Sequence, residues 1–246
     1  MIREYHRPKT LEEALKLLQH PEAVPLGGGS WLSQQKEREV IAVDLQALGL
    51  NTIERRGPFI EIGAQVTLQQ WLESEDCPED MRRAISLEAP LNLRHTATVA
   101  GTIVTCDGSS PFVTALLALD ARLVRYEDGK QQETFLGDFL PFRPHGLITT
   151  VRIPAQVKFA FEYVARTPLD VPIVCAALTR WPSGRTRLTL GGWGEHPRLA
   201  MDGPEAEGLE IAARNAFYEA GDERASAEYR REIAAVLARR ALEKVR

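Results

Sequence analysis

A change of pattern near Pro154 divides the sequence into two parts. Before it, short apolar runs typical of strands alternate with helical or turn-rich stretches, as in a mixed α/β domain. These runs are Val40–Leu45, Phe59–Ala64, Ala121–Tyr126 and Leu147–Ile153. After it come three runs typical of successive antiparallel strands, Phe159–Ala165, Ile173–Arg180 and Thr186–Trp193. Helical sequence follows, so the pattern predicts an α/β domain over about residues 1–155 and a separate α+β domain over 156–246.

Capping pairs and apolar spacing predict the main helices. Thr10 with Glu13 forms a capping box at the start of a helix that extends to His20. Thr67 with Gln70 begins another. The last helix has the clearest apolar spacing, at Tyr229, Ile233, Val236, Leu237 and Ala241. We expect its arginines to form a solvated face; they are Arg230, Arg231, Arg239 and Arg240.

Composition excludes several classes of function. Acidic and basic residues nearly balance, 34 against 30, so no broad positive field favours nucleic acid. The start carries no apolar signal core and no stretch approaches the roughly 20 apolar residues of a membrane span, so we expect a cytoplasmic chain without membrane insertion. Cys77, Cys106 and Cys175 are widely separated and form no C-x-x-C pair, which argues against a disulfide framework, a zinc site or an iron–sulfur cluster. A redox role would therefore need a bound organic cofactor.

A run of three glycines is the first candidate site. Gly27, Gly28 and Gly29 expose main-chain N–H groups and permit close approach, as a pyrophosphate requires. The alternative is an ordinary turn between a strand and a helix beginning near Ser30. Neither the P-loop nor the dinucleotide Rossmann spacing is present. The candidate binding residues here are Leu26, Gly27, Gly28, Gly29, Ser30 and Trp31, where Trp31 either covers a ring or begins a core helix.

The second candidate is a stretch rich in small and hydroxylated residues between Arg94 and Pro111. Ser110 and Pro111 suit a helix cap and first turn, which attract anions, although capped helix starts are commonplace. His95 lies at the start of this stretch and is assigned no catalysis. Two such loops in one chain suit a long cofactor such as FAD. The candidate binding residues are Thr98, Val99, Ala100, Gly101, Thr102, Asp107 and Ser110.

Taken in order, the segments resemble the FAD-binding subunit of the xanthine dehydrogenase and carbon monoxide dehydrogenase family along nearly the whole chain. The resemblance rests on matching pieces in the correct order. They are Tyr5-x-Arg7-Pro8-x-Thr10-Leu11, Leu26-Gly27-Gly28-Gly29-Ser30, Val43-Asp44-Leu45, Ile62-Gly63-Ala64, Arg94-x-x-Ala97-Thr98-Val99-Ala100-Gly101-Thr102, Leu147-Ile148-Thr149 and Leu190-Gly191-Gly192-Trp193, followed by Ala225–Arg231 and Arg239–Leu242.

The resemblance implies an α+β fold. A two-subdomain FAD-binding fold like that of vanillyl-alcohol oxidase would span about 1–50 and 51–155, with Leu147 among the cofactor contacts, and a small α+β domain would follow. It also implies an oxidoreductase subunit that is not competent alone. In such enzymes, electrons leave a molybdopterin cofactor on a large subunit and pass through the iron–sulfur clusters of a small subunit. The FAD-binding subunit receives them and passes them on. No catalytic acid, nucleophile or metal ligand is expected, since the cofactor performs the chemistry.

Several residues depart from the family pattern. Ala100 replaces a glycine in the second loop, and Thr102 replaces the usual Asn or Ser. Pro111 and Tyr163 stand where an aspartate and a lysine are common. These changes permit a second interpretation, a flavin-free homologue that acts as a structural or interaction subunit. An independent flavin oxidase is disfavoured, because the sequence indicates no substrate pocket with an evident catalytic acid or base.

Overall fold

The computed structural model describes residues 1–34, 39–127, 129–168 and 170–246, which form two compact units. The first unit comprises Met1–Ser74, Leu91–Thr105 and Arg122–Arg152. The second comprises Glu75–Pro90, Cys106–Ala121 and Ile153–Arg246. The α+β class is confirmed. The domain boundary at 155/156 stays a prediction, because two segments that precede it belong to the second unit.

The N-terminal sheet of the first unit is parallel, with strand order β1-β3-β2. Its strands are β1 (Ile2–His6), β2 (Ala23–Leu26) and β3 (Val40–Asp44), and its helix is α1 (Leu11–Leu17). Ala14 of α1 packs with Val43 and Leu45 in one apolar cluster. The Tyr5 hydroxyl donates a hydrogen bond to the carboxylate of Asp44, which is 3% exposed, so side chains also link β1 to the end of β3. Two 3-10 helices follow β2 and β3, η1 (Leu32–Gln34) and η2 (Gln46–Leu48).

The second sheet of this unit has the order β4-β5-β8-β6-β7. Its strands are β4 (Ile53–Arg56), β5 (Phe59–Gly63), β6 (Arg122–Glu127), β7 (Lys130–Phe135) and β8 (Leu147–Pro154). The helices of the unit are α2 (Leu68–Glu73), α4 (Leu91–Arg94), α5 (Val99–Thr105) and α7 (Leu136–Phe139). The capping box expected at Thr67 and Gln70 is present at the start of α2.

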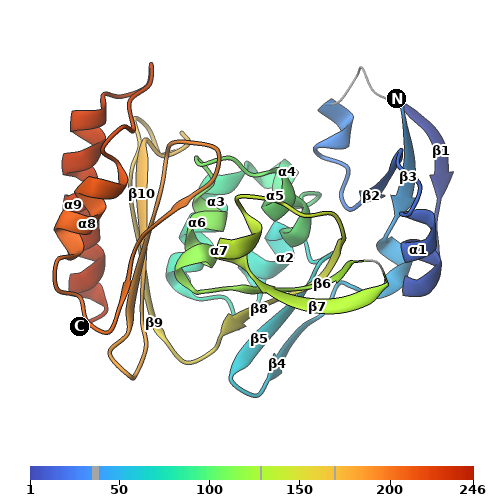
Figure 1. Cartoon of the computed structure of the whole chain (residues 1–246), viewed down its shortest axis with the longest axis horizontal. Helices are drawn as coiled ribbons and strands as arrows, with labels where there is room; N and C mark the ends of the chain where they lie inside the picture. The colour runs from blue at the N-terminus through green and yellow to red at the C-terminus, as the bar shows by residue number, and fades with distance from the viewer. Residues whose placement is uncertain (35–38, 128, 169) are drawn as a thin grey trace. The chain divides into compact units, whose positions relative to one another are not determined.

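The second unit is built on one antiparallel sheet in the order β12-β11-β10-β9 (Figure 1). Its strands are β9 (Lys158–Val164), β10 (Val174–Arg180), β11 (Thr186–Gly191) and β12 (Arg198–Gly203). Helices α8 (Leu209–Ala216) and α9 (Ala227–Lys244) cover one face, and α3 (Glu79–Glu88) and α6 (Pro111–Ala118) pack on the other.

Alternation along β10 explains these two faces. Val174, Ala176 and Leu178 point into the apolar core beneath α8 and α9. The intervening Cys175 points toward α6, where its thiol donates a weak hydrogen bond to the Thr114 hydroxyl at 3.7 Å. Because both of its faces are covered, β10 is a nearly continuous apolar run in the sequence.

The expected solvated arginine face of α9 is wrong at Arg230, which is completely buried. Its guanidinium donates to the main-chain oxygens of Ile173 at 3.2 Å and Ala220 at 2.8 Å. It also donates to the Asp222 carboxylate at 2.9 Å. A buried charge is tolerated when hydrogen bonds satisfy it, so Arg230 ties α9 to the loop that precedes it.

We predict that Arg230→Met lowers the free energy of unfolding by about 3 kcal/mol, because it leaves buried carbonyls and Asp222 without their donor. Arg239→Met is the matched control, since Arg239 is exposed on the same helix and should change stability by less than about 0.5 kcal/mol. Urea unfolding followed by circular dichroism measures both. Equal effects of the two substitutions would contradict the role of Arg230.

The start of α6 is capped by a carboxylate of this chain. Ser110 is the N-cap residue, and its hydroxyl accepts from the main-chain N–H of Val113 at 3.1 Å. The Glu88 carboxylate accepts from the Ser110 hydroxyl at 2.7 Å and from the N–H of Phe112 at 3.0 Å. Desolvation by burial outweighs these hydrogen bonds and raises the pKa of Glu88 above its ordinary value.

This raised pKa gives Glu88 a defined effect on stability. The folded state holds the Glu88 proton more tightly than the unfolded chain, so its contribution is complete below the ordinary glutamate pKa of about 4.3 and is lost as the pH rises through the folded pKa. Compared with Glu88→Gln, the wild-type protein should therefore lose relative stability as the pH rises from about 4. Denaturant unfolding of both proteins across this pH range tests the prediction. A wild-type protein that becomes more stable relative to Glu88→Gln as the pH rises would contradict it.

Candidate functional site

The glycine run follows β2 and lies directly against the segment that precedes α5. A Cβ placed on Gly28 would stand 1.4 Å from the main-chain oxygen of Thr96. One placed on Gly27 would stand 2.9 Å from the Thr98 hydroxyl. Gly29 has a φ of +74°, which favours glycine on conformational grounds. The structure thus brings the two predicted loops together, and Gly28 is required because main chain meets main chain there.

The same loop carries unpaired hydrogen-bond donors. Among the described residues, the main-chain N–H groups of Gly27, Gly28 and Gly29 have no hydrogen-bond partner. Gly28 is exposed and its two neighbours are partly buried. Adjacent unpaired N–H groups in a turn form a concavity that attracts anions. This part of the site therefore fits the pyrophosphate expected from the sequence.

The second loop differs, because its N–H groups are already used within the chain. Those of Val99 and Ala100 donate to the carbonyls of Val66 at 2.8 Å and Ala64 at 3.4 Å. That of Gly101 donates to the Thr98 hydroxyl at 3.1 Å. Thr102 is bonded through both its N–H and its hydroxyl to the Thr98 carbonyl, each at 2.9 Å. This loop positions the first one and offers few donors of its own.

The segment leaving β5 supports both loops. A Cβ on Gly63 would lie 2.3 Å from the Leu50 carbonyl, which explains the glycine of the Ile62-Gly63-Ala64 motif. Gln65 follows, and its side-chain nitrogen lies 3.4 Å from the position of a Cβ on Gly27. Sequence reasoning missed Gln65, because a single glutamine before a helix cap carries no recognisable signal.

The other candidates of the first unit lie in different surroundings. The Leu26 carbonyl accepts from the N–H of Leu45 at 3.1 Å, and the Ser30 carbonyl accepts from the Ser33 hydroxyl at 3.0 Å. Trp31 is 47% exposed, so the interpretation as a core residue is wrong. Leu147 is buried in the cluster that contains Ala14, where it packs the N-terminal core.

Asp107 and Ser110 belong to the second unit. Asp107 is exposed and accepts from the N–H of Ser109 at 2.7 Å, a turn contact. Gly108 exchanges hydrogen bonds with the 192–194 turn, at 2.8 Å to the Gly194 carbonyl and 2.7 Å from the Gly192 N–H. The Glu88 carboxyl group occupies the helix start beyond it, so the Ser110 hydroxyl is already engaged.

Two of the three cysteines have thiols of low reactivity. All three are free and buried, and desolvation raises the pKa of Cys77 and of Cys175 to about 12. Such thiols are poor nucleophiles at neutral pH. Among the described residues, no helix combines the length and the hydrophobicity that a membrane span requires.

Known proteins are similar to this chain in sequence and fold along nearly its full length. The family described as the FAD binding domain in molybdopterin dehydrogenase matches residues 1–156. The uncharacterized protein YgfM of Escherichia coli K12 is 29% identical, with 96% of this chain and 94% of YgfM covered. The carbon monoxide dehydrogenase medium chain of Afipia carboxidovorans is 27% identical, with 99% and 96% covered.

A solved structure agrees with these matches. A chain in the crystal structure of cyanide-inactivated Cu,Mo-CO dehydrogenase is 25% identical and superposes with a TM-score of 0.85, covering 100% of this chain and 98% of that chain. The family match spans more than half of the sequence and includes both loops of the site. This chain therefore belongs to the family of FAD-binding domains in molybdopterin dehydrogenases, whose cofactor is FAD.

Proposed function

We propose that the chain is the FAD-binding electron-transfer subunit of a heteromeric molybdopterin-dependent dehydrogenase. Electrons would pass from a molybdopterin large subunit to an iron–sulfur small subunit and then to this chain. This chain would pass them to an external acceptor. The carbon monoxide dehydrogenase relative is named a medium chain, as is a glyceraldehyde dehydrogenase chain of Sulfolobus acidocaldarius that is 24% identical. These names support a role beside other subunits, so we expect no complete reaction from this chain alone.

The observation that carries the proposal is the set of unpaired N–H groups at Gly27, Gly28 and Gly29. We assign them to the cofactor pyrophosphate, with Thr98 and Gln65 holding the loop in place. Leu26, Ser30, Trp31 and residues 99–102 complete the proposed surroundings. Bound FAD supplies the redox chemistry, and the chain orients it and stabilises its phosphate charge with main-chain dipoles.

A second candidate function is a flavin-free structural or interaction subunit. It is favoured by the second loop, whose N–H groups are bonded within the chain, and by Glu88 at the α6 start. Both features reduce the donors that remain for a cofactor. The two functions differ in one property, the retention of flavin.

The decisive measurement is the visible spectrum of the purified chain before and after incubation with excess FAD and desalting. The electron-transfer subunit should retain flavin at near one equivalent per chain. A colourless chain that also stays colourless when purified together with its partner subunits would overturn the proposal in favour of the structural subunit.

The substitution Gly28→Ala tests the loop itself. The new methyl group would meet the Thr96 carbonyl, push the loop away and reduce flavin retention at least about tenfold, because the three N–H groups would no longer converge. Gly203→Ala is the matched control, since its Cβ would have only ordinary contacts, the nearest at 3.6 Å. Circular dichroism checks that both variants fold. Normal flavin content in folded Gly28→Ala would refute the loop assignment.

A further inference from the structure

A side-chain amide stands beside the glycine run without a hydrogen-bond partner. The nitrogen Nε2 of Gln65 lies 3.4 Å from the position that a Cβ on Gly27 would take. Within the described part of the chain this amide makes no hydrogen bond, although the residue is partly buried. Polar groups removed from water usually have partners, so an unpaired amide next to unpaired N–H groups indicates a ligand that accepts from both.

The main chain around Gln65 is held firmly in place. Its own N–H donates to the Leu50 carbonyl at 2.7 Å, and the carbonyl of the following Val66 accepts from the N–H of Val99 at 2.8 Å. Ala64 and Val66 are buried on either side, whereas Gln65 keeps part of its surface exposed. The amide is therefore presented from a fixed point, which reduces the entropy lost when it binds a ligand.

The amide is close enough to the loop to share one phosphate group with it. Two bonds of about 1.5 Å separate the Gly27 nitrogen from the Cβ position, so this nitrogen is no more than about 6 Å from Nε2 of Gln65. Two N–H donors that bind one oxygen, each at about 2.9 Å, can stand up to about 6 Å apart. The spacing is therefore compatible with a phosphate between them.

The chemistry of residue 65 also determines which ligand fits. An amide is neutral and carries two N–H donors, so it can bind an oxyanion beside the main-chain N–H groups. The other side chain close to Gly27 is Thr98, whose hydroxyl is also neutral and lies 2.9 Å from the same Cβ position. A carboxylate in place of the amide would have the same shape but would repel a phosphate.

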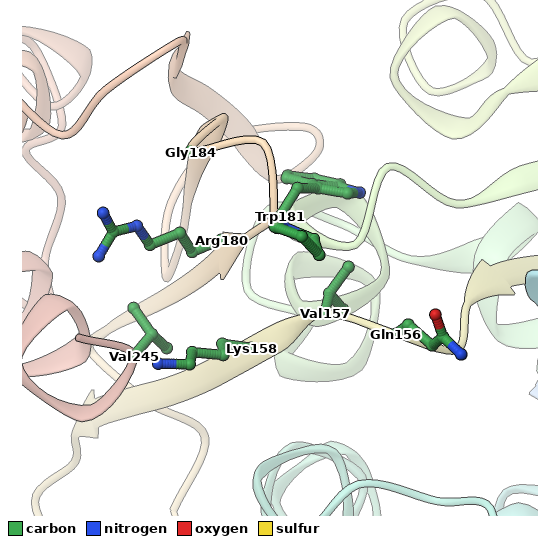
Figure 2. A pocket seen from close by; sticks show the side chains of 8 residues that line it. Gln156, Val157, Lys158, Arg180, Trp181, Gly184 and Val245 are labelled. Carbon is green, nitrogen blue, oxygen red and sulfur yellow. The ribbon is translucent and has the colours of Figure 1, made fainter.

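A pocket in the second unit differs from this arrangement. It lies at the start of β9 and has a volume of about 580 Å³. In Figure 2 the Trp181 ring lies on one side, while the charged ends of Lys158 and Arg180 extend to the other. Lys158 also donates to the main-chain oxygen of Arg246 at 2.7 Å. The polar groups of that pocket therefore do not face one common ligand, in contrast to the donors around Gly27.

We propose that the Gln65 side chain donates a hydrogen bond to the phosphate held by the glycine run. It is the side-chain member of a donor set otherwise made of main-chain N–H groups. This inference rests on the proposed function, because the phosphate is part of the FAD pyrophosphate. It extends that function, since Gln65 then contacts the cofactor and determines its affinity in addition to packing against the loop.

Two substitutions of similar size separate a donor from a packing residue. Gln65→Met should weaken FAD binding about tenfold, the effect of losing one hydrogen bond to a charged group. Gln65→Glu should weaken it further at about pH 8, because a carboxylate repels the phosphate. Its affinity should recover as the pH falls toward about 5 and the carboxylate takes up a proton. Quenching of FAD fluorescence by the flavin-free full chain measures each affinity.

A charge control and a folding control accompany these variants. Gln132→Glu adds the same charge at an exposed position of β7 and should leave FAD affinity unchanged at every pH. Circular dichroism checks that all variants fold. A folded Gln65→Met with wild-type affinity, or a Gln65→Glu whose affinity does not depend on pH, would overturn the proposal.

ADP distinguishes failure of this inference from failure of the proposed function, since it carries a diphosphate but no flavin. If the wild-type chain binds FAD and the Gln65 variants bind it equally well, only this inference fails. If the wild-type chain binds no FAD even beside its partner subunits, the proposed function fails, and isothermal titration with ADP decides the role of Gln65. Weaker ADP binding by Gln65→Glu than by the wild type supports the donor, whereas equal binding or none overturns it.

Discussion

Main-chain contact without room for a side chain is the constraint on which this structure depends. Gly28 meets Thr96 in this way, and Gly63 meets Leu50. In the second unit, a Cβ on Gly108 would lie 2.1 Å from the Trp193 carbonyl. Each contact restricts a loop by close main-chain packing instead of an apolar side chain, and at Gly63 and Gly108 hydrogen bonds add to it. The loops can therefore be partly exposed and still hold a defined shape.

The contacts around the glycine run also determine its electrostatic character. The side chains shown to approach it, Thr98 and Gln65, are neutral, and so is the main chain of Thr96. A phosphate held by the N–H groups of the loop would be met by main-chain dipoles at short range. Salt screens such an interaction much less than it screens exposed ion pairs.

Local sequence signals predicted much of the fold. The strand at Val40 begins at the expected residue and the caps at Thr10 and Thr67 are formed, because periodicity and capping depend on near neighbours. The glycine run and the Thr98 loop were expected to act together, and they are adjacent. Periodicity in α9 did not show that Arg230 is buried, since its partners lie on the loops at 173 and 220–225.

The remaining differences come from contacts distant in sequence. Ser110 was correctly expected to cap a helix. Its partner Glu88 lies 22 residues earlier and carries no motif, so the engagement of that helix start could not be anticipated. Likewise, the carbonyls that occupy the N–H groups of α5 come from Ala64 and Val66. A motif identifies which groups are able to bind a ligand, whereas the tertiary fold decides which remain free.

The division of the chain into units has a consequence for how such a protein can be rearranged. Segments 75–90 and 106–121 lie inside the sequence matched by the FAD-binding family, yet they supply α3 and α6 to the C-terminal sheet. Cutting the gene at the end of that match would strip one face of the sheet and expose Cys175 and its neighbours. The C-terminal part therefore cannot be exchanged between proteins as one continuous segment. A recombinant that replaces the complete second unit must also replace segments 75–90 and 106–121.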